Sequence, residues 1–345
     1  MDCDIEKYFD PYEGRPLKIV TRALCSNRLA HAYLITGPDS FVTSANARAA
    51  AKLLLCLSPE HNERVGRPCS KCPACRKVDS DTHPDLLQIE PQGAFIKIGQ
   101  IKEMQRQFSF PPLEGRRRIA VIHHAETLGL YASNALLKIL EEPPEYGHLI
   151  LSAVNPKALL PTITSRCQHL HQGPIPDKTI SDFLASKGIS HPYLIHLSEG
   201  SVSRAKMLLD ADIVGFRDKF IDFLKTQKGW EALLMQLAQQ ASMDQETFKR
   251  LLHVVSSVVH DMLILKSSKP RTANKDTDCL VCKDKKLELA DVASDFEACL
   301  LEEYSEILLK MEFHLARNAN RLLMALALLL FWKIKKFGTL RGYGK

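Results

Sequence analysis

The sequence predicts a parallel α/β domain followed by helical domains, and three observations carry this prediction. Apolar runs of strand length alternate five times with helical patterns up to about residue 173, which implies a parallel sheet covered on both faces. From Ile180 onward only helical patterns follow. Four cysteines with the spacing of metal ligands interrupt the first half, and they predict an inserted metal module.

Composition sets the broad class of the protein. Of 345 residues, 45% are hydrophobic and 25% charged, which is ordinary for a globular chain of two or three domains. The formal charge of +6 permits contact with nucleic acid but does not argue for it. The N-terminus carries acids where a signal peptide needs bases, and the apolar stretch Leu322–Trp332 is too short to cross a membrane. Ten cysteines without a secretory signal indicate reduced thiols or metal ligands, and therefore the cytoplasm.

The expected elements follow from hydrophobic periodicity. Strands are predicted at 31–36, 86–90, 118–123, 148–154 and 166–170, with helices at 46–57, 98–108 and 133–142. Further helices are predicted at 180–187, 191–197, 201–209, 212–226, 230–240, 244–265, 287–299 and 302–336. We therefore expect an α/β domain at 1–173, a small helical domain at 174–210 and a helical C-terminal domain at 211–345. The polar segment 267–286 is expected to be a loop or partly disordered.

The cysteine quartet is the strongest chemical signal. Cys56, Cys69, Cys72 and Cys75 combine one cysteine with two successive Cys-x-x-Cys steps, and this spacing suits the tetrahedral thiolate site of zinc better than four unrelated thiols. Cys56 is expected at the end of the preceding helix, and the module spans about 56–78. Four thiolates leave no open coordination position, so the site is predicted to be structural.

A second Cys-x-x-Cys pair, Cys279 and Cys282, has no partner pair in the sequence. We interpret these two residues as exposed thiols in a loop.

A degenerate phosphate loop follows the first strand. A working loop reads G-x-x-x-x-G-K-[ST], whose lysine neutralises phosphate charge. The corresponding octet is 37–44, in which only Gly37 and Ser44 match this pattern. Pro38 follows the first glycine, Val42 replaces the second glycine and Thr43 replaces the lysine. Asp39 adds negative charge. The octet alone is equally typical of a plain strand-to-helix turn, and its position between a buried strand and a long helix favours a relic of a phosphate loop.

The third strand ends without the acid that holds magnesium in hydrolytic relatives of such folds. His123 and His124 stand there instead, and adjacent strand residues point to opposite faces, which makes them poor joint ligands. Before this strand, Arg116-Arg117-Arg118 is interpreted as a solvated loop, with contact to DNA phosphates as the alternative.

An arginine and two glutamates are ambiguous. Arg166, in Thr164-Ser165-Arg166-Cys167, is either a solvated charge, a salt-bridge partner or an arginine finger offered to a neighbouring subunit. Glu141 and Glu142 oppose the dipole at the end of their predicted helix, which hints at a polar or subunit contact, although a solvated helix end explains them equally well.

Taken together, these motifs resemble the delta-prime clamp-loader subunits of bacterial DNA polymerase III, members of the AAA+ family related to gamma/tau. The resemblance rests on the four cysteines and on His31–Leu34, Gly37-Pro38, Thr82–Asp85, Asn134–Pro144, Pro161–Ile163, Ser165–Cys167 and Arg317–Asn320.

The resemblance implies an AAA+ domain, a helical lid at 174–210 and a C-terminal helical collar that joins the subunits of a ring. It also implies a stator subunit that neither binds nor hydrolyses ATP, with zinc on the four cysteines. Arg166 is implied to act in trans on a gamma/tau site. The implied partners are gamma/tau, delta, the sliding clamp and primed DNA, with no membrane.

Two departures and two alternatives remain at this stage. Arg204 is one residue out of register for a sensor arginine, and the family does not explain 267–286. An ATP-hydrolysing gamma/tau-type subunit is one alternative, against which Thr43 argues. A zinc-dependent nucleic-acid-binding protein is the other; basic residues surround the cysteines, but no aromatic does.

Overall fold

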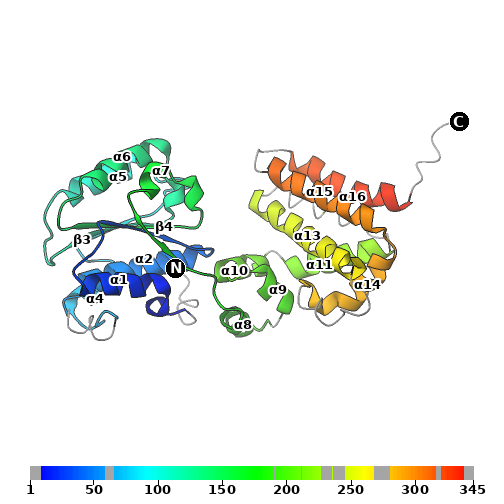
Figure 1. Ribbon diagram of the computed structural model, residues 1–345, viewed down its shortest axis with the longest axis horizontal. Helices are drawn as coiled ribbons and strands as arrows, with labels where there is room; N and C mark the ends of the chain where they lie inside the picture. The colour runs from blue at the N-terminus through cyan, green and yellow to red at the C-terminus, as the bar shows by residue number, and fades with distance from the viewer. Residues whose placement is uncertain are drawn as a thin grey trace. The chain divides into compact units, whose positions relative to one another are not determined.

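The computed structural model describes residues 9–58, 66–189, 191–210, 212–226, 235, 245–267, 280–315 and 320–337. The chain forms two compact units (Figure 1). Unit 1 comprises Met1–Phe183 and Glu199–Ser203, and unit 2 comprises Leu184–Ser198 and Arg204–Lys345.

Unit 1 contains a parallel five-stranded sheet in the order β2-β3-β4-β1-β5. The strands are β1 Ala32–Thr36, β2 Leu86–Ile89, β3 Arg118–Ile122, β4 Gly147–Ala153 and β5 Gln168–His171. The helices are α1 Arg15–Cys25, α2 Ser40–Leu55, α4 Pro73–Asp79, α5 Ile98–Phe108, α6 Leu130–Glu141 and α7 Pro161–Thr164. The predicted parallel α/β sheet, with all five strands, is confirmed.

Two hydrophobic cores cover the two faces of this sheet. Leu34 of β1 packs in the core formed with α5 and α6, whereas its neighbours Tyr33 and Ile35 pack in the core formed with α1 and α2. This alternation follows from the two-residue side-chain period of a strand. Figure 1 shows the same layers, with α5, α6 and α7 on one side of the sheet and α1, α2 and α4 on the other.

Helix α2 begins six residues earlier than the predicted 46–57, because Asp39 caps it: the Val42 N–H donates to Asp39 Oδ1 at 3.0 Å. Such a cap satisfies one of the unpaired amides at a helix start. Helix α1 was missed although Leu17 and Val20 form a buried stripe on it, a spacing that periodicity can detect.

From Asp177 onward, the described part of the chain contains helices and no strand. The helices are α8 Asp177–Ser186, α9 Pro192–Leu197, α10 Val202–Asp210, α11 Ile213–Thr226, α13 Gln245–Ser267, α14 Lys286–Ser294, α15 Ala298–Leu315 and α16 Arg321–Phe337. A helical C-terminal region is thereby confirmed. The predicted helix at 230–240 lies outside the described residues, apart from 235.

The prediction of one helix at 302–336 is wrong. Asn320 starts a new helix, because its Oδ1 accepts the N–H of Leu322 at 3.0 Å. The helices α15 and α16 then pack side by side (Figure 1): Tyr304 Oη donates to Leu328 O at 3.0 Å, and the Tyr304 and Trp332 rings lie 4.5 Å apart. The helix predicted at 287–299 also ends earlier, at Ser294. In the described part of the chain, no helix combines the length and hydropathy that a membrane crossing requires.

The core of unit 2 contains a fully buried arginine. Both terminal nitrogens of Arg217 bond to Asp284, at 2.8 and 2.7 Å, and its Nε donates to Asp218 at 2.9 Å. The guanidinium stacks on the Tyr193 ring, 4.3 Å from its centroid. Such pairing is required for a buried charge, and it fastens the 283–285 turn to α9 and α11.

Candidate functional site: metal centre, phosphate-loop position and arginine

The four predicted metal ligands converge in unit 1. Their sulfur atoms all lie within 4.8 Å of one another; Cys56 Sγ is 3.6 Å from Cys69 Sγ, which is 4.0 Å from Cys75 Sγ. Zinc–sulfur bonds of about 2.3 Å place the corners of a tetrahedron about 3.8 Å apart, so the donor set fits a four-coordinate zinc ion. Cys56 caps the C-terminus of α2, as predicted.

Backbone amides also point at these sulfurs. The Cys69 N–H donates to Cys56 Sγ, the Cys72 N–H to Cys69 Sγ and the Cys75 N–H to Cys72 Sγ, at 3.3–3.4 Å. Burial alone raises the pKa of the Cys69 thiol, but the amides of Lys71 and Cys72 outweigh it and lower the value to about 5. At Cys69 the knuckle therefore favours thiolate, the form that binds metal, whereas burial raises the pKa of Cys56 and Cys75.

The phosphate-loop position contains a helix start rather than a loop. Because α2 begins at Ser40, Val42 lies in regular helix and, unlike the glycine it replaces in a working phosphate loop, needs no positive φ. Thr43 is 1% exposed, and its hydroxyl donates to Ser40 O at 3.0 Å. The Val42 amide is taken by the Asp39 carboxylate and the Thr43 amide by the Asp39 carbonyl.

Asp39 is 2% exposed and accepts hydrogen bonds from a distant segment as well as from α2. Ser201 Oγ donates to Oδ2 at 3.0 Å, the Ser203 N–H donates to Oδ2 at 2.9 Å and Ser203 Oγ donates to Oδ1 at 2.9 Å. The preceding Gly200 has φ +75°, and a Cβ there would lie 2.3 Å from Pro174 Cβ. A built-in anion thus occupies the N-terminus of α2, where helix dipole and free amides attract phosphates in other proteins.

Gly37 keeps the end of β1 close to the chain after β5. A Cβ at this position would lie 2.8 Å from Gln172 O and 3.2 Å from Thr43 Cγ2. The glycine is therefore explained by close packing, without reference to a ligand.

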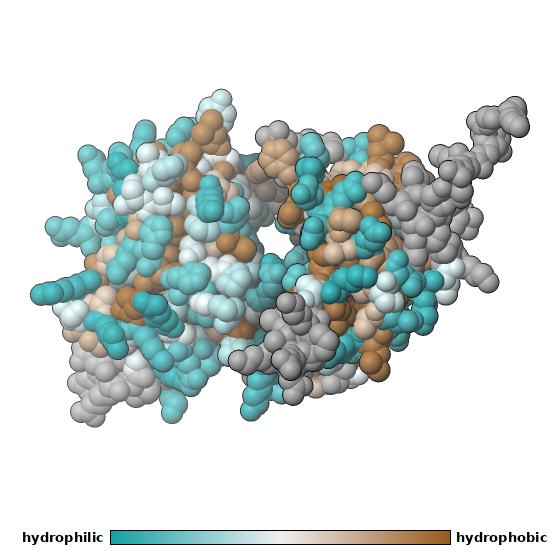
Figure 2. Space-filling model, turned by 45° about the vertical axis from the view of Figure 1, so that its right-hand side comes forward, coloured by the Kyte–Doolittle hydropathy of each residue, from teal (hydrophilic) through white to brown (hydrophobic). Residues whose placement is uncertain are grey.

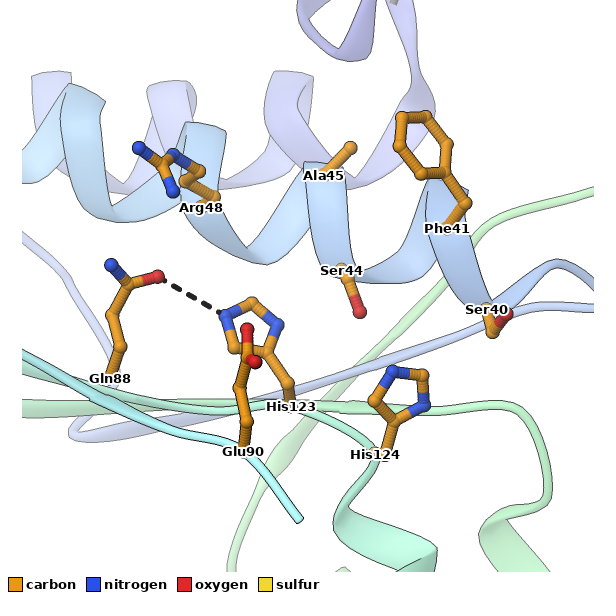
Figure 3. A pocket seen from close by; sticks show the side chains of 9 residues that line it. All are labelled: Ser40, Phe41, Ser44, Ala45, Arg48, Gln88, Glu90, His123 and His124. Carbon is orange, nitrogen blue, oxygen red and sulfur yellow. Dashed lines mark hydrogen bonds between the residues drawn. The ribbon is translucent and has the colours of Figure 1, made fainter. Parts of the chain in front are cut away.

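A pocket of about 310 Å³ lies beside this helix start, lined by Ser40, Phe41, Ser44, Ala45, Arg48, Gln88, Glu90, His123 and His124 (Figure 3). Arg48 brings a permanent positive charge, but that charge is compensated: Nη1 is 2.8 Å from Asp81 Oδ1, and Nη2 donates to Val78 O. With Glu90 at its edge, the pocket offers poor electrostatics for a polyphosphate.

The two histidines share one pocket, so the expectation that they point to opposite faces is wrong. Strand β3 ends at Ile122, and His124 adopts a left-handed φ of 52°, which removes the strand alternation. His123 is 5% exposed, and its Nε2 lies 3.4 Å from Gln88 Oε1. Burial, and then the neighbouring His124 and Arg48, lower the pKa of His123 to about 4. Among the described residues, only the cysteine quartet brings enough ligand atoms together for a metal.

Arg166 lies in the turn after α7 and pairs with the helix end that the sequence left ambiguous. Its Nη2 is 2.8 Å from Glu141 Oε1, at the last residue of α6, and its Nη1 donates to Thr162 O at 3.0 Å. The side chains are 36% and 50% exposed. The positive charge of Arg166 therefore offsets the unfavourable interaction between the Glu141 carboxylate and the helix dipole at the C-terminus of α6.

Two residues have environments that differ from the expected ones. Arg118 is 5% exposed, not solvated, and lies 3.5 Å from the fully buried Asp85. Burial raises the pKa of Asp85, but the amides of 113–115 outweigh burial and lower it.

Cys282 is buried, not exposed, because Asp261 accepts its N–H at 2.6 Å and holds this turn inside unit 2. Cys279 lies outside the described residues, as do Arg317, Asn318 and Ala319 of the quoted C-terminal motif.

Comparisons with known proteins find relatives among the subunits of DNA polymerase III. A family model described as DNA polymerase III, delta subunit matches residues 13–176. A DNA polymerase III subunit delta' from Bacillus subtilis is 35% identical over 55% of this chain and 56% of its own length. The corresponding subunit from Pseudomonas aeruginosa is 37% identical over 40% of this chain and 42% of its own.

Subunits named tau or gamma/tau match as well. A DNA polymerase III subunit tau/gamma from Haemophilus influenzae is 32% identical over 48% of this chain and 23% of its own length. The chain thus spans about half or less of the length of these relatives. The prediction that the chain resembles the delta-prime subunit of bacterial DNA polymerase III is confirmed by these matches.

Proposed function

We propose that the chain is a non-hydrolysing stator subunit of the DNA polymerase III clamp loader, which helps load the sliding clamp on primed DNA. The main support for a subunit that does not hydrolyse ATP is the buried Asp39 carboxylate, which caps the start of α2. A bound phosphate needs those amides and a nearby lysine, whereas this chain has a buried carboxylate and Thr43. Like charge at that point opposes a polyphosphate.

The main competing function is an ATP-hydrolysing subunit of the gamma/tau type, since such subunits are among the relatives. Gly37, Pro38, Thr43 and Ser44 would then form a nucleotide-binding loop. The described geometry argues for the stator, and ATP affinity separates the two. The isolated chain should bind ATP no more tightly than it binds other anions, whereas micromolar binding abolished by Ser44→Ala would favour the ATPase.

Arg166 is the residue that we propose to act on a neighbour. Its guanidinium is partly exposed, and the surface ion pair that holds it is of a kind that contributes only about 0–1 kcal/mol, so the guanidinium can also engage a phosphate of a partner. An arginine supplied in trans accelerates phosphoryl transfer by about 10³–10⁵-fold. The receiving partner in this proposal is a gamma/tau subunit, with delta in the same ring.

The cysteine quartet is proposed to hold one structural zinc ion. The donor set is all sulfur and closed, with amides directed at three of the sulfurs. A closed site leaves no position for water or substrate, so its contribution is to the stability of the 56–78 module.

The last two helices are proposed to belong to a collar that assembles the ring, and residues 174–210 are proposed to form a lid that precedes the collar in the sequence. Their exposed apolar side chains, at 40–65% exposure, are Leu309, Phe313, Leu322, Leu323 and Leu330. Figure 2 shows apolar surface on the part of the molecule that carries these helices. Exposed apolar side chains gathered on two helices are a feature that subunit interfaces share. A chain ending near Asp210 that still entered the complex would contradict the assignment.

The test of the whole proposal is DNA-stimulated ATP hydrolysis by a complex reconstituted from gamma/tau and delta. It is measured without the chain, with the wild-type chain and with Arg166→Ala. Wild type should raise the rate, and the alanine variant should assemble without raising it. If neither form changes the rate, the stator function in trans is wrong.

A further inference from the structure

Glu141 and Thr162 hold the Arg166 guanidinium from two different elements. Glu141 closes α6 and bonds to Nη2, while the Thr162 carbonyl, in α7, bonds to Nη1. The two helices pack together in the same core, through Leu136 and Ile139 of α6 and Ile163 of α7. Their packing fixes both acceptors relative to each other, so the plane of the guanidinium is set before any partner arrives.

The remaining donors of Arg166 stay available. A guanidinium has five N–H groups, and the two acceptors use one on each terminal nitrogen. Within the described part of the chain, no other hydrogen bond or ion pair of the Arg166 guanidinium is found; the backbone N–H of Arg166 donates to Ile163 O at 3.1 Å. The Arg166 side chain is therefore oriented while some of its N–H groups stay available for a partner. Arg217 differs, because it is fully buried and paired with the carboxylates of Asp218 and Asp284.

We infer that Glu141 is a positioning residue for Arg166: it holds the guanidinium in the orientation in which it meets a phosphate of the neighbouring subunit. This inference rests on the proposed function of Arg166. A long side chain held in its working rotamer loses less conformational freedom when it engages its target, and correct orientation contributes directly to the barrier of the chemical step. Glu141 itself does not contact the nucleotide.

The inference predicts a defined pattern of variants in the reconstituted complex. Glu141→Ala should lower kcat for ATP hydrolysis about fivefold, which equals about 1 kcal/mol in the barrier, with KM for ATP unchanged. Glu141→Gln keeps an oxygen acceptor for Nη2 and should stay within about twofold of wild type. Glu142→Ala is the matched control, because the exposed Glu142 is the next residue at the same helix end.

The outcomes separate this inference from the proposed function. Complex formation by each variant is verified by gel filtration before the rates are compared. If Arg166→Ala leaves the rate unchanged, the proposed function fails. If Arg166→Ala abolishes the stimulation while Glu141→Ala matches Glu142→Ala, the function stands and the positioning role is wrong. A rate increase in Glu141→Ala would also overturn it, because Glu141 would then restrain Arg166 instead of presenting it.

Discussion

Replacement of Asp39 by alanine tests the reasoning about the phosphate-loop position most directly. The carboxylate accepts four hydrogen bonds, one from α2 and three from residues 201–203. Loss of the cap costs about 1 kcal/mol. Each of the other three bonds ends on a charged acceptor and contributes about 1.5 kcal/mol at the low end of the usual range.

These contributions add to about 5.5 kcal/mol, and two effects reduce the sum. Removing a buried charge also removes its desolvation cost, and Ser203 is only partly buried, so water can replace one bond. We therefore expect Asp39→Ala to destabilise unit 1 by about 3–5 kcal/mol, a large share of the usual 5–15 kcal/mol for a whole protein. Asp39→Asn should retain the cap but place an amide NH₂ against the Ser203 N–H, and should cost at least half as much.

The appropriate assay is native-state hydrogen exchange of the β1 and α2 amides, because a chain of two compact units need not unfold in one step. Asn155→Ala is the control: Asn155 also caps a helix, accepting the Lys157 N–H at 3.2 Å, but in an exposed position. It should cost less than about 1 kcal/mol. Equal effects of Asp39→Ala and Asn155→Ala would refute the claim that a buried carboxylate organises the start of α2.

Three further predictions concern metal, pH and the core of unit 2. Metal analysis of the purified chain should find about one zinc per chain, and Cys69→Ser with Cys72→Ser should lose it; a metal-free wild type would exclude the site. Because the pKa of His123 is lowered to about 4 in the folded state, the unfolded chain binds more protons between about pH 4 and 6.5, and this residue should cost about 2 kcal/mol of stability on going from pH 7 to 5. Urea unfolding at both pH values should show a smaller decrease for His123→Gln than for wild type. Arg217→Ala should destabilise unit 2 by about 3–5 kcal/mol. Hydrogen exchange of the α11 amides, followed at increasing urea, should then show unfolding at a lower urea concentration than in wild type; an unchanged midpoint would contradict the buried network.

The strands could be predicted because each is a short, nearly continuous apolar run, as expected for a parallel sheet buried on both faces. The cysteine site could be predicted for a related reason: three of its four ligands lie within seven residues, so local spacing carries the geometry. The start of α2 could not be placed, because the octet resembles a phosphate loop and the capping role of Asp39 depends on its conformation. The new helix start at Asn320 was hidden by the apolar residues of the predicted single helix on both sides of it.

Contacts between distant residues explain the rest of the differences. Asp39 and Ser201 are separated by 162 positions, and no local pattern in the sequence predicts their contact. Asp39 was therefore interpreted as a charge facing phosphate, whereas its hydrogen-bond partners hold it in the interior. Glu141 and Arg166 show the same effect. Each was ambiguous by itself, one as an unfavourable charge at a helix end and the other as a solvated arginine. Their 2.8 Å contact accounts for both, because the arginine offsets the helix-end conflict while the glutamate orients the arginine.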